Sequence, residues 1–199
     1  MDRDGAPERW RLFIAIALSE EARGALAEAQ VVCRRCRLPL RWIEPRGAHL
    51  TVKFLGDVAR ERVPALADAL AGLAGLHEPF QLWTGPAGAF PNARRPRVLW
   101  LGITGATECL DDLQQDLETA LEGLGFPPDG RPFRPHLTLG RVRDGAPPEL
   151  PGLGGVLAEL QRATPAPLPV EELLLMRSDL SGGGPRYTTL AVARLGDAR

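Results

Sequence analysis

The feature that most constrains the fold is a four-residue pattern that occurs twice. Residues 49–52 read His-Leu-Thr-Val and residues 136–139 read His-Leu-Thr-Leu. In a β-strand successive side chains point to opposite faces, so the histidine and threonine of each copy share one face and the apolar pair occupies the other. Each copy therefore predicts a half-buried strand that presents an imidazole beside a hydroxyl.

Two similar halves surround these strands. One apolar run begins at Leu12 and another at Val98, and the two runs precede His49 and His136 by nearly equal distances along the chain. Each interval contains one helical pattern. We therefore expect an internal duplication in which the two His-x-Thr strands are pseudo-symmetric partners.

The remaining elements follow from periodicity and turn residues. Ser19 is expected to cap the first helix, since Glu20 and Glu21 follow in its first turn. The glycine- and proline-rich segment 85–96 predicts a loop that crosses between two lobes, and residues 182–184 predict a second loop. Apolar stripes at helical spacing predict further helices over residues 63–73, 110–124 and 156–162. Strands are expected over residues 12–18, 41–43, 80–84, 98–103, 170–176 and 187–195.

The two repeated histidines suggest acid–base chemistry. Imidazole titrates near neutral pH, and a hydroxyl can donate or accept a hydrogen bond. Two such pairs on one cleft would supply an acid, a base and two donors for an anionic oxygen. The alternatives are a binding module that holds phosphates without turnover, and a metal site on His49 and His136, for which the sequence shows no matched third ligand. The third histidine, His77, is assigned to a surface or capping role.

Charge and composition exclude several classes of protein. A net charge of −1 argues against a broad basic surface for long nucleic acid, but leaves a small anionic ligand or a nucleic-acid end open. Lys53 is the only lysine and Phe54 follows it, which excludes a Walker-type phosphate loop. The three cysteines, an odd number, predict a reducing, cytoplasmic location. The apolar run 12–18 is too short to span a membrane, so no membrane association is expected.

Landmark segments in a fixed order carry a family resemblance over almost the whole chain. The chain resembles the two-histidine phosphoesterase superfamily, and within it the bacterial and archaeal RNA 2′,3′-cyclic phosphodiesterases, once named 2′-5′ RNA ligases. Val52 stands where that family often has leucine, which an inward-facing position tolerates. The landmarks are Arg11–Ile16, Arg41–Ile43, His49–Gly56, Pro96–Gly102, Phe133–Arg141, and Ser178–Leu180 with Tyr187.

The resemblance implies an α+β fold in which residues 1–199 form a single bilobal domain. Two antiparallel sheets would face each other across a central cleft, with helices outside and one His-x-Thr motif per lobe. The implied activity is hydrolysis of RNA or nucleotide 2′,3′-cyclic phosphate ends to a 2′-phosphate, without metal or cofactor. Some members also join tRNA halves by reversible 2′-5′ ligation. The expected partners are RNA ends or 2′,3′-cyclic nucleotides, and we expect a monomer.

The resemblance also assigns roles to residues. His49 would be the acid that protonates the departing 3′ oxygen, and His136 the base that activates water. The two motifs are nearly identical, so the residues alone also allow the opposite assignment. Thr51 and Thr138 are expected to hydrogen-bond the non-bridging phosphate oxygens, where negative charge accumulates. Arg141 would add a charge-assisted contact, but strict alternation puts it on the opposite face from His136 unless a bulge at the neighbouring glycine turns it inward.

Four further side chains are candidates for substrate contacts. Tyr187 is expected to bind the base or ribose. By strict alternation Lys53 shares the face of His49, which makes it a weaker candidate for the phosphate. Phe13 and Trp42 are further candidates for the base or ribose, and each of these three aromatic residues fits a place in the core equally well.

Overall fold

The computed structural model describes residues 7–181 and 184–197. Residues 182 and 183 of the expected glycine-rich loop lie outside the described residues. Within the described part, no helix is long and apolar enough to cross a membrane.

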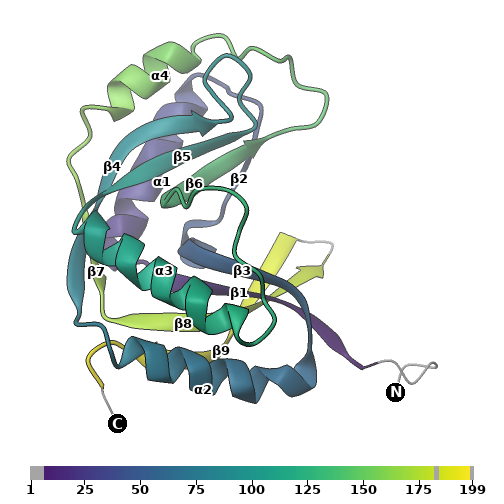
Figure 1. Cartoon of the computed structure of the whole chain (residues 1–199). Helices are drawn as coiled ribbons and strands as arrows, with labels where there is room; N and C mark the ends of the chain where they lie inside the picture. Colours follow the sequence, from purple (N-terminus) through teal and green to yellow (C-terminus); the bar gives the residue numbers. More distant parts are fainter. Residues whose placement is uncertain (1–6, 182–183, 198–199) are drawn as a thin grey trace.

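The strands form two antiparallel sheets, one in each lobe (Figure 1). The four-stranded sheet has the order β3-β1-β8-β9 and the five-stranded sheet the order β2-β6-β5-β4-β7. This confirms the expected α+β, two-lobed fold. The strands are β1 Arg9–Ala17, β2 Leu40–Trp42, β3 His49–Ala59, β4 Phe80–Phe90, β5 Val98–Gly105, β6 His136–Val142, β7 Pro167–Val170, β8 Glu172–Ser181 and β9 Gly184–Arg194.

Four α-helices cover the outer faces of the described sheets. The first begins where the sequence predicts, because the Ser19 hydroxyl accepts a hydrogen bond from the backbone N–H of Ala22 at 3.0 Å. Burial of Leu110, Leu113 and Leu117 fixes the inward face of the third. The helices are α1 Glu20–Arg35, α2 Val63–Ala74, α3 Thr107–Glu122 and α4 Leu153–Leu160, with short 3-10 turns at Pro45–Gly47 and Arg60–Arg62.

The two halves of the sequence exchange elements between the lobes. Helix α1 follows β1 of the four-stranded sheet but packs against β4, β6 and β7 of the five-stranded sheet. Helix α3 follows β5 of the five-stranded sheet but packs against β3 and α2. Each half of the duplication therefore contributes to both lobes, and neither lobe is continuous in sequence.

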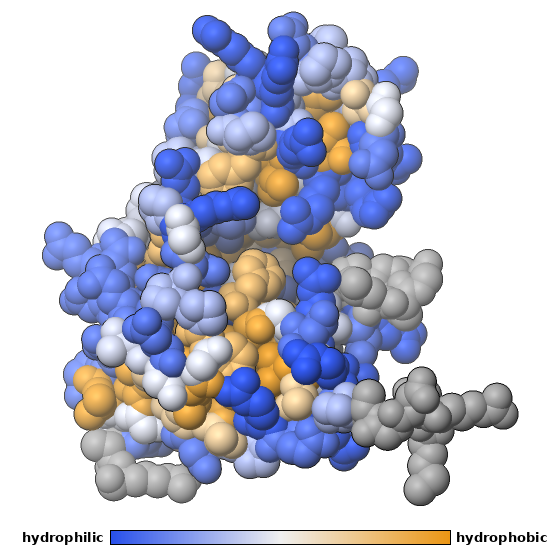
Figure 2. Space-filling view, turned by 45° about the vertical axis from the view of Figure 1, so that its right-hand side comes forward, coloured by the Kyte–Doolittle hydropathy of each residue, from blue (hydrophilic) through white to orange (hydrophobic). Residues whose placement is uncertain are grey.

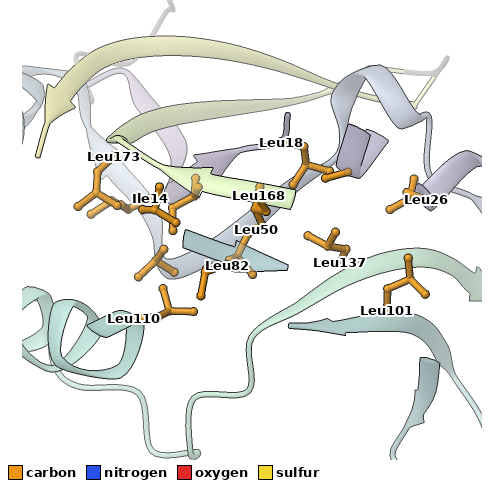
Figure 3. Close-up of a cluster of buried hydrophobic side chains, with 14 of the residues drawn as sticks. Ile14, Leu18, Leu26, Leu50, Leu82, Leu101, Leu110, Leu137, Leu168 and Leu173 are labelled. Atoms are coloured by element: carbon orange, nitrogen blue, oxygen red, sulfur yellow. The ribbon is translucent and has the colours of Figure 1, made fainter. Parts of the chain in front are cut away.

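One apolar core joins the lobes next to the two motifs. Leu50 and Leu137, which directly follow the two histidines, are both fully buried in this core. Figure 3 shows their side chains in one cluster, together with Leu82 and Leu168 of the five-stranded sheet. The core therefore fixes β3 and β6 relative to each other at the positions beside His49 and His136.

The expected loop over residues 85–96 is wrong in its first half. The expected crossing between the lobes is also wrong, because the remainder of the segment joins β4 to β5, which are neighbours in the same sheet. Strand β4 continues through this segment to Phe90, with an irregular register between Thr84 and Ala87. Gly88 permits the strand to pass Trp100, since a Cβ there would lie 2.3 Å from a carbon of the indole ring. The glycines that suggest a loop thus serve close packing inside a sheet. Strand β7, which contains two prolines, was also not predicted; it pairs only with β4, at the sheet edge.

Candidate active site

The sheet register places both motifs on helix-free faces. In the four-stranded sheet His49 lies opposite Ala17 and Thr51 lies opposite Ala15. Residues directly opposite each other in an antiparallel pair share a face, and here that face lies away from the core that α2 and α3 cover.

The second motif repeats this arrangement in the other sheet. His136 lies opposite Gly102, and Thr138 lies opposite Trp100. Strands β3 and β6 contact each other where the lobes meet. Figure 2 shows the surface hollowed between the lobes. The charge of Arg141, on the motif face of the five-stranded sheet, acts on Tyr187 of the four-stranded sheet, and we infer from this that the two motif faces border one cleft.

Each histidine is held by a pair of aromatic rings. The His49 ring stacks on Phe13 with centroids 4.7 Å apart, and the edge of Tyr187 meets it at 4.9 Å. The His136 ring meets Phe90 edge-on at 4.9 Å, with Trp100 at 6.4 Å. Packing on two sides restricts each imidazole to one orientation.

The hydrogen bonds of the two imidazoles are equivalent. His49 Nδ1 lies 3.0 Å from the carbonyl oxygen of Gly47, and His136 Nδ1 lies 2.7 Å from the carbonyl oxygen of Arg134. A carbonyl oxygen only accepts, so each Nδ1 carries a hydrogen and donates it. In both rings Nε2 is therefore the nitrogen that can take or give a proton.

Burial lowers the pKa of both histidines. Desolvation lowers the pKa of His49, and the hydrogen bond to Gly47 opposes this. Desolvation also lowers the pKa of His136, opposed by the bond to Arg134 and assisted by the positive charge of Arg141. Both imidazoles are therefore poised to be neutral more readily than an exposed histidine.

A β-bulge brings Arg141 to the cleft. Thr138 pairs with Trp100, whereas Gly140 pairs with Leu99, so Leu139 is an extra residue in β6. Arg141 then lies opposite Val98, on the same face as Thr138. The structure therefore contains the bulge beside Gly140 on which an inward-facing Arg141 depends. The charge of Arg141 lowers the pKa of His136 in its own lobe and opposes the rise that burial causes in the pKa of Tyr187 in the other lobe.

A second bulge removes Lys53 from the cleft and makes the expected placement wrong. Thr51 pairs with Ala15, whereas Lys53 pairs with Ile14, so Val52 is the extra residue. The Lys53 side chain points into the core, forms an ion pair with Glu118 and donates a hydrogen bond to the carbonyl oxygen of Pro127 at 3.0 Å. Lys53 is therefore a structural residue.

The other candidates divide between the cleft and the core. Tyr187 lies at the cleft, against His49. Trp42 does not, because it pairs with Gly140 on the helix-covered face and its ring packs under Arg34 of α1. His77 is only partly exposed, and its Nε2 lies 3.1 Å from Asp116 Oδ2 of α3. It joins α2 to α3, away from both motifs.

Sequence reasoning missed three aromatic residues of the cleft. Phe90 was assigned to a loop, and Trp100 was read only as part of an apolar strand. Phe54 lies opposite Phe13 on the cleft face and is 58% exposed. The bulge at Val52 decides its orientation, and strict alternation would have placed it in the core. Among the described residues, no group of three His, Cys, Asp or Glu side chains could hold a metal ion.

Comparison with known proteins decides the family. The family model described as the 2′-5′ RNA ligase superfamily matches residues 17–182. The chain belongs to this superfamily. It is 35% identical over 185 residues to an RNA 2′,3′-cyclic phosphodiesterase of Methanothermobacter thermautotrophicus, covering 93% of this chain and 98% of the relative.

Two solved structures that are similar to this chain share its fold. TT0787 of Thermus thermophilus superposes with a TM-score of 0.77 and 33% identity, over 95% of this chain and all of that one. Escherichia coli LigT, in a complex with 3′-AMP, superposes with a TM-score of 0.67 and 28% identity, over 94% of this chain and 99% of LigT. The bilobal arrangement of this superfamily member is therefore that of nucleotide-binding LigT.

Proposed function

We propose that the chain is an RNA 2′,3′-cyclic phosphodiesterase that produces 2′-phosphate ends. The observation that carries this proposal is the matched pair of imidazoles, each with Nδ1 bound to a carbonyl and Nε2 available, on the two motif strands. The activity named for the Methanothermobacter relative and the 3′-AMP complex of LigT support it.

The reaction needs one proton acceptor and one proton donor. His136 Nε2 takes a proton from water as the water oxygen attacks phosphorus. The bond from phosphorus to the ribose 3′ oxygen breaks, and that oxygen receives the Nε2 proton of protonated His49. One water molecule is consumed and a terminal 2′-phosphate forms. Before the next cycle His136 releases its proton to solvent and His49 takes up a proton from solvent, which restores the starting state.

The neighbouring polar groups would stabilise the phosphorane-like transition state. Thr51 and Thr138 lie two residues from the histidines on the same faces, so their hydroxyls are placed to donate to the non-bridging oxygens. Arg141 adds a charge-assisted contact from the bulged end of β6. Protons and hydrogen-bond donors suffice for these steps, so we expect no requirement for a metal ion.

The cleft face of the four-stranded sheet would receive the nucleoside. Phe54 is exposed there beside Phe13, with ring centroids 6.2 Å apart. Nucleobases stack on exposed aromatic rings with little dependence on sequence. Tyr187, half-buried against His49, is placed for the ribose. The phosphate would then react between the two lobes, and the base would contact the four-stranded sheet.

The same groups would support 2′-5′ joining. If an RNA 5′-hydroxyl replaces water, the base takes its proton and the same 3′ oxygen leaves, which forms a 2′-5′ phosphodiester. No nucleotide cofactor enters this step. Because the lobes exchange helices, we propose that residues 1–199 act as one domain and that neither lobe is active alone.

The test is hydrolysis by the purified protein in the presence of a chelator. Wild-type protein should hydrolyse 2′,3′-cyclic AMP and a cyclic-phosphate-ended oligonucleotide at rates unchanged by EDTA. His77→Ala is the matched control, since it removes the third histidine without touching the cleft. Tight binding of both ligands without turnover would favour the binding-module alternative. Loss of activity on chelation, restored by one divalent ion, would contradict the metal-free mechanism.

A further inference from the structure

Two arginines lie side by side on the cleft face of the five-stranded sheet. In the pairing of β2 with β6, Arg41 lies directly opposite Arg141. Side chains at such positions have Cβ atoms about 5 Å apart, and like charges there are destabilising. Within the described residues, neither arginine takes part in an ion pair. The protein thus maintains two adjacent positive charges without a visible structural benefit.

The register fixes the face on which this arginine pair lies. The next pair along the strands is Trp42 with Gly140, and the Trp42 ring packs under α1. A Cβ on Gly140 would lie 3.5 Å from that ring, so both positions face the helix. Arg41 and Arg141, one residue away, therefore face the cleft, and both are exposed.

The arginine pair lies one step beyond the catalytic motif. Thr138 is opposite Trp100 and Arg141 is opposite Val98, so the two positions are separated by two residues of β5. Two residues of a strand span about 7 Å. This step is of the order of the spacing between successive phosphates in an extended nucleotide chain. A phosphate at the threonines would therefore leave the next phosphate of an RNA chain near the arginine pair.

On the opposite wall of the cleft the arginine of the register has an acidic cross-strand neighbour instead of a second arginine, although no ion pair joins the two among the described residues. Arg11 shares the face of Tyr187 through Ser178, but it lies opposite Asp57 in the pairing of β1 with β3. An uncompensated positive pair therefore occurs on the five-stranded sheet, beside His136. A local site of this kind agrees with a chain whose net charge is −1, because it needs no broad basic surface.

We propose that Arg41, together with Arg141, binds the phosphate on the 5′ side of the terminal nucleoside. The preferred substrate is then an RNA end of two or more nucleotides, and an isolated 2′,3′-cyclic nucleotide is a poorer one. This inference rests on the proposed hydrolysis of cyclic phosphates. Arg141 contacts both the cyclic phosphate and the phosphate on the 5′ side. Arg41 contacts only the phosphate on the 5′ side and therefore favours substrates of two or more nucleotides.

The experiment compares kcat/KM for the dinucleotide ApA with a 2′,3′-cyclic phosphate end and for 2′,3′-cyclic AMP. Wild-type protein should prefer the dinucleotide, and Arg41→Met should reduce that preference by about 10-fold, the expected size for one charge-assisted contact. Arg41→Lys should retain part of the preference. Arg41→Met should also reduce the salt dependence of dinucleotide cleavage by about one unit of slope.

Arg194→Met is the matched control. Arg194 is exposed and lies opposite Glu172 in the register of β8 with β9, at the far end of β9 from the motifs. The Arg194→Met variant should therefore keep the wild-type preference for the dinucleotide. The inference would be overturned if the wild type hydrolysed the dinucleotide and 2′,3′-cyclic AMP with equal kcat/KM. It would also be overturned if Arg41→Met and Arg194→Met preferred the dinucleotide to the same extent. Either result would leave the proposed function intact. Hydrolysis of neither substrate by the wild type would overturn both.

Discussion

Lys53 forms a buried ion pair with Glu118, although Lys53 lies only two residues from Thr51. The Lys53 side chain is 1% exposed, and it also binds the carbonyl oxygen of Pro127, in the segment that leads from α3 to His136. A single lysine thus joins the strand of one motif to the segment that precedes the other. The ion pair lies on the core side of the sheet, opposite the cleft face, and holds β3 in place there.

We expect Lys53→Met to lower the free energy of unfolding by about 3 kcal/mol, because it leaves the Glu118 carboxylate partly buried without its partner. Chemical denaturation measures this change. The double variant Lys53→Met, Glu118→Met should recover most of the loss, since no unpaired charge is left. A loss below about 1 kcal/mol in the single variant would show that the pair does not stabilise the fold.

Both histidines should be required for turnover, and their roles should be separable. His49→Ala and His136→Ala should each abolish most activity on 2′,3′-cyclic AMP, whereas His77→Ala should not. A substrate whose leaving group needs no protonation should restore turnover in His49→Ala only, because that variant lacks the acid but keeps the base. Restoration in His136→Ala instead would reverse the two roles.

The pH dependence of kcat/KM should be bell-shaped, with its maximum on the acid side of 6.5. One histidine must be protonated and the other neutral, and burial lowers the pKa of both below the ordinary value of 6.5. The rate falls when rising pH deprotonates the acid and when falling pH protonates the base. The two apparent values belong to the coupled pair. A maximum well above pH 7 would contradict the effect of burial.

The threonines should matter less than the histidines. Thr51→Ala and Thr138→Ala should each lower kcat by about 10²–10³-fold, the usual cost of one oxyanion donor. Thr→Ser at either position keeps the hydroxyl and should restore most of the rate. If serine were no better than alanine, the methyl group and its packing would explain the loss, and the hydroxyl would have no catalytic role.

The strands and helices of this chain were largely predictable because each depends on local periodicity. The choice of the sheet against which each helix packs was not predictable in this way. The stripe of α1 shows which side of the helix is buried, but nothing local indicates that the helix packs against the sheet that β1 does not join. That choice is made by contacts between segments far apart in sequence.

Two β-bulges limit how much of the site could be predicted from the alternation of side chains along the strands. Both histidines and both threonines precede the bulges, so simple alternation places them correctly. Just past these two bulges the assignments are reversed: Lys53 lies in the core, and Phe54 and Arg141 lie on the cleft face. A further irregularity at Leu55 returns Gly56 to the face that alternation predicts. Gly140 gave a signal for the second bulge. The first, at Val52, has no glycine and gave none.

The regiochemistry of cleavage tests the central claim most directly. Purified wild-type protein is incubated with 2′,3′-cyclic AMP and EDTA, and phosphorus NMR follows the products against 2′-AMP and 3′-AMP standards. If His136 activates water and His49 protonates the departing 3′ oxygen, 2′-AMP should accumulate as the predominant product. Predominant 3′-AMP would contradict the account, because water would then have entered from the opposite side of phosphorus.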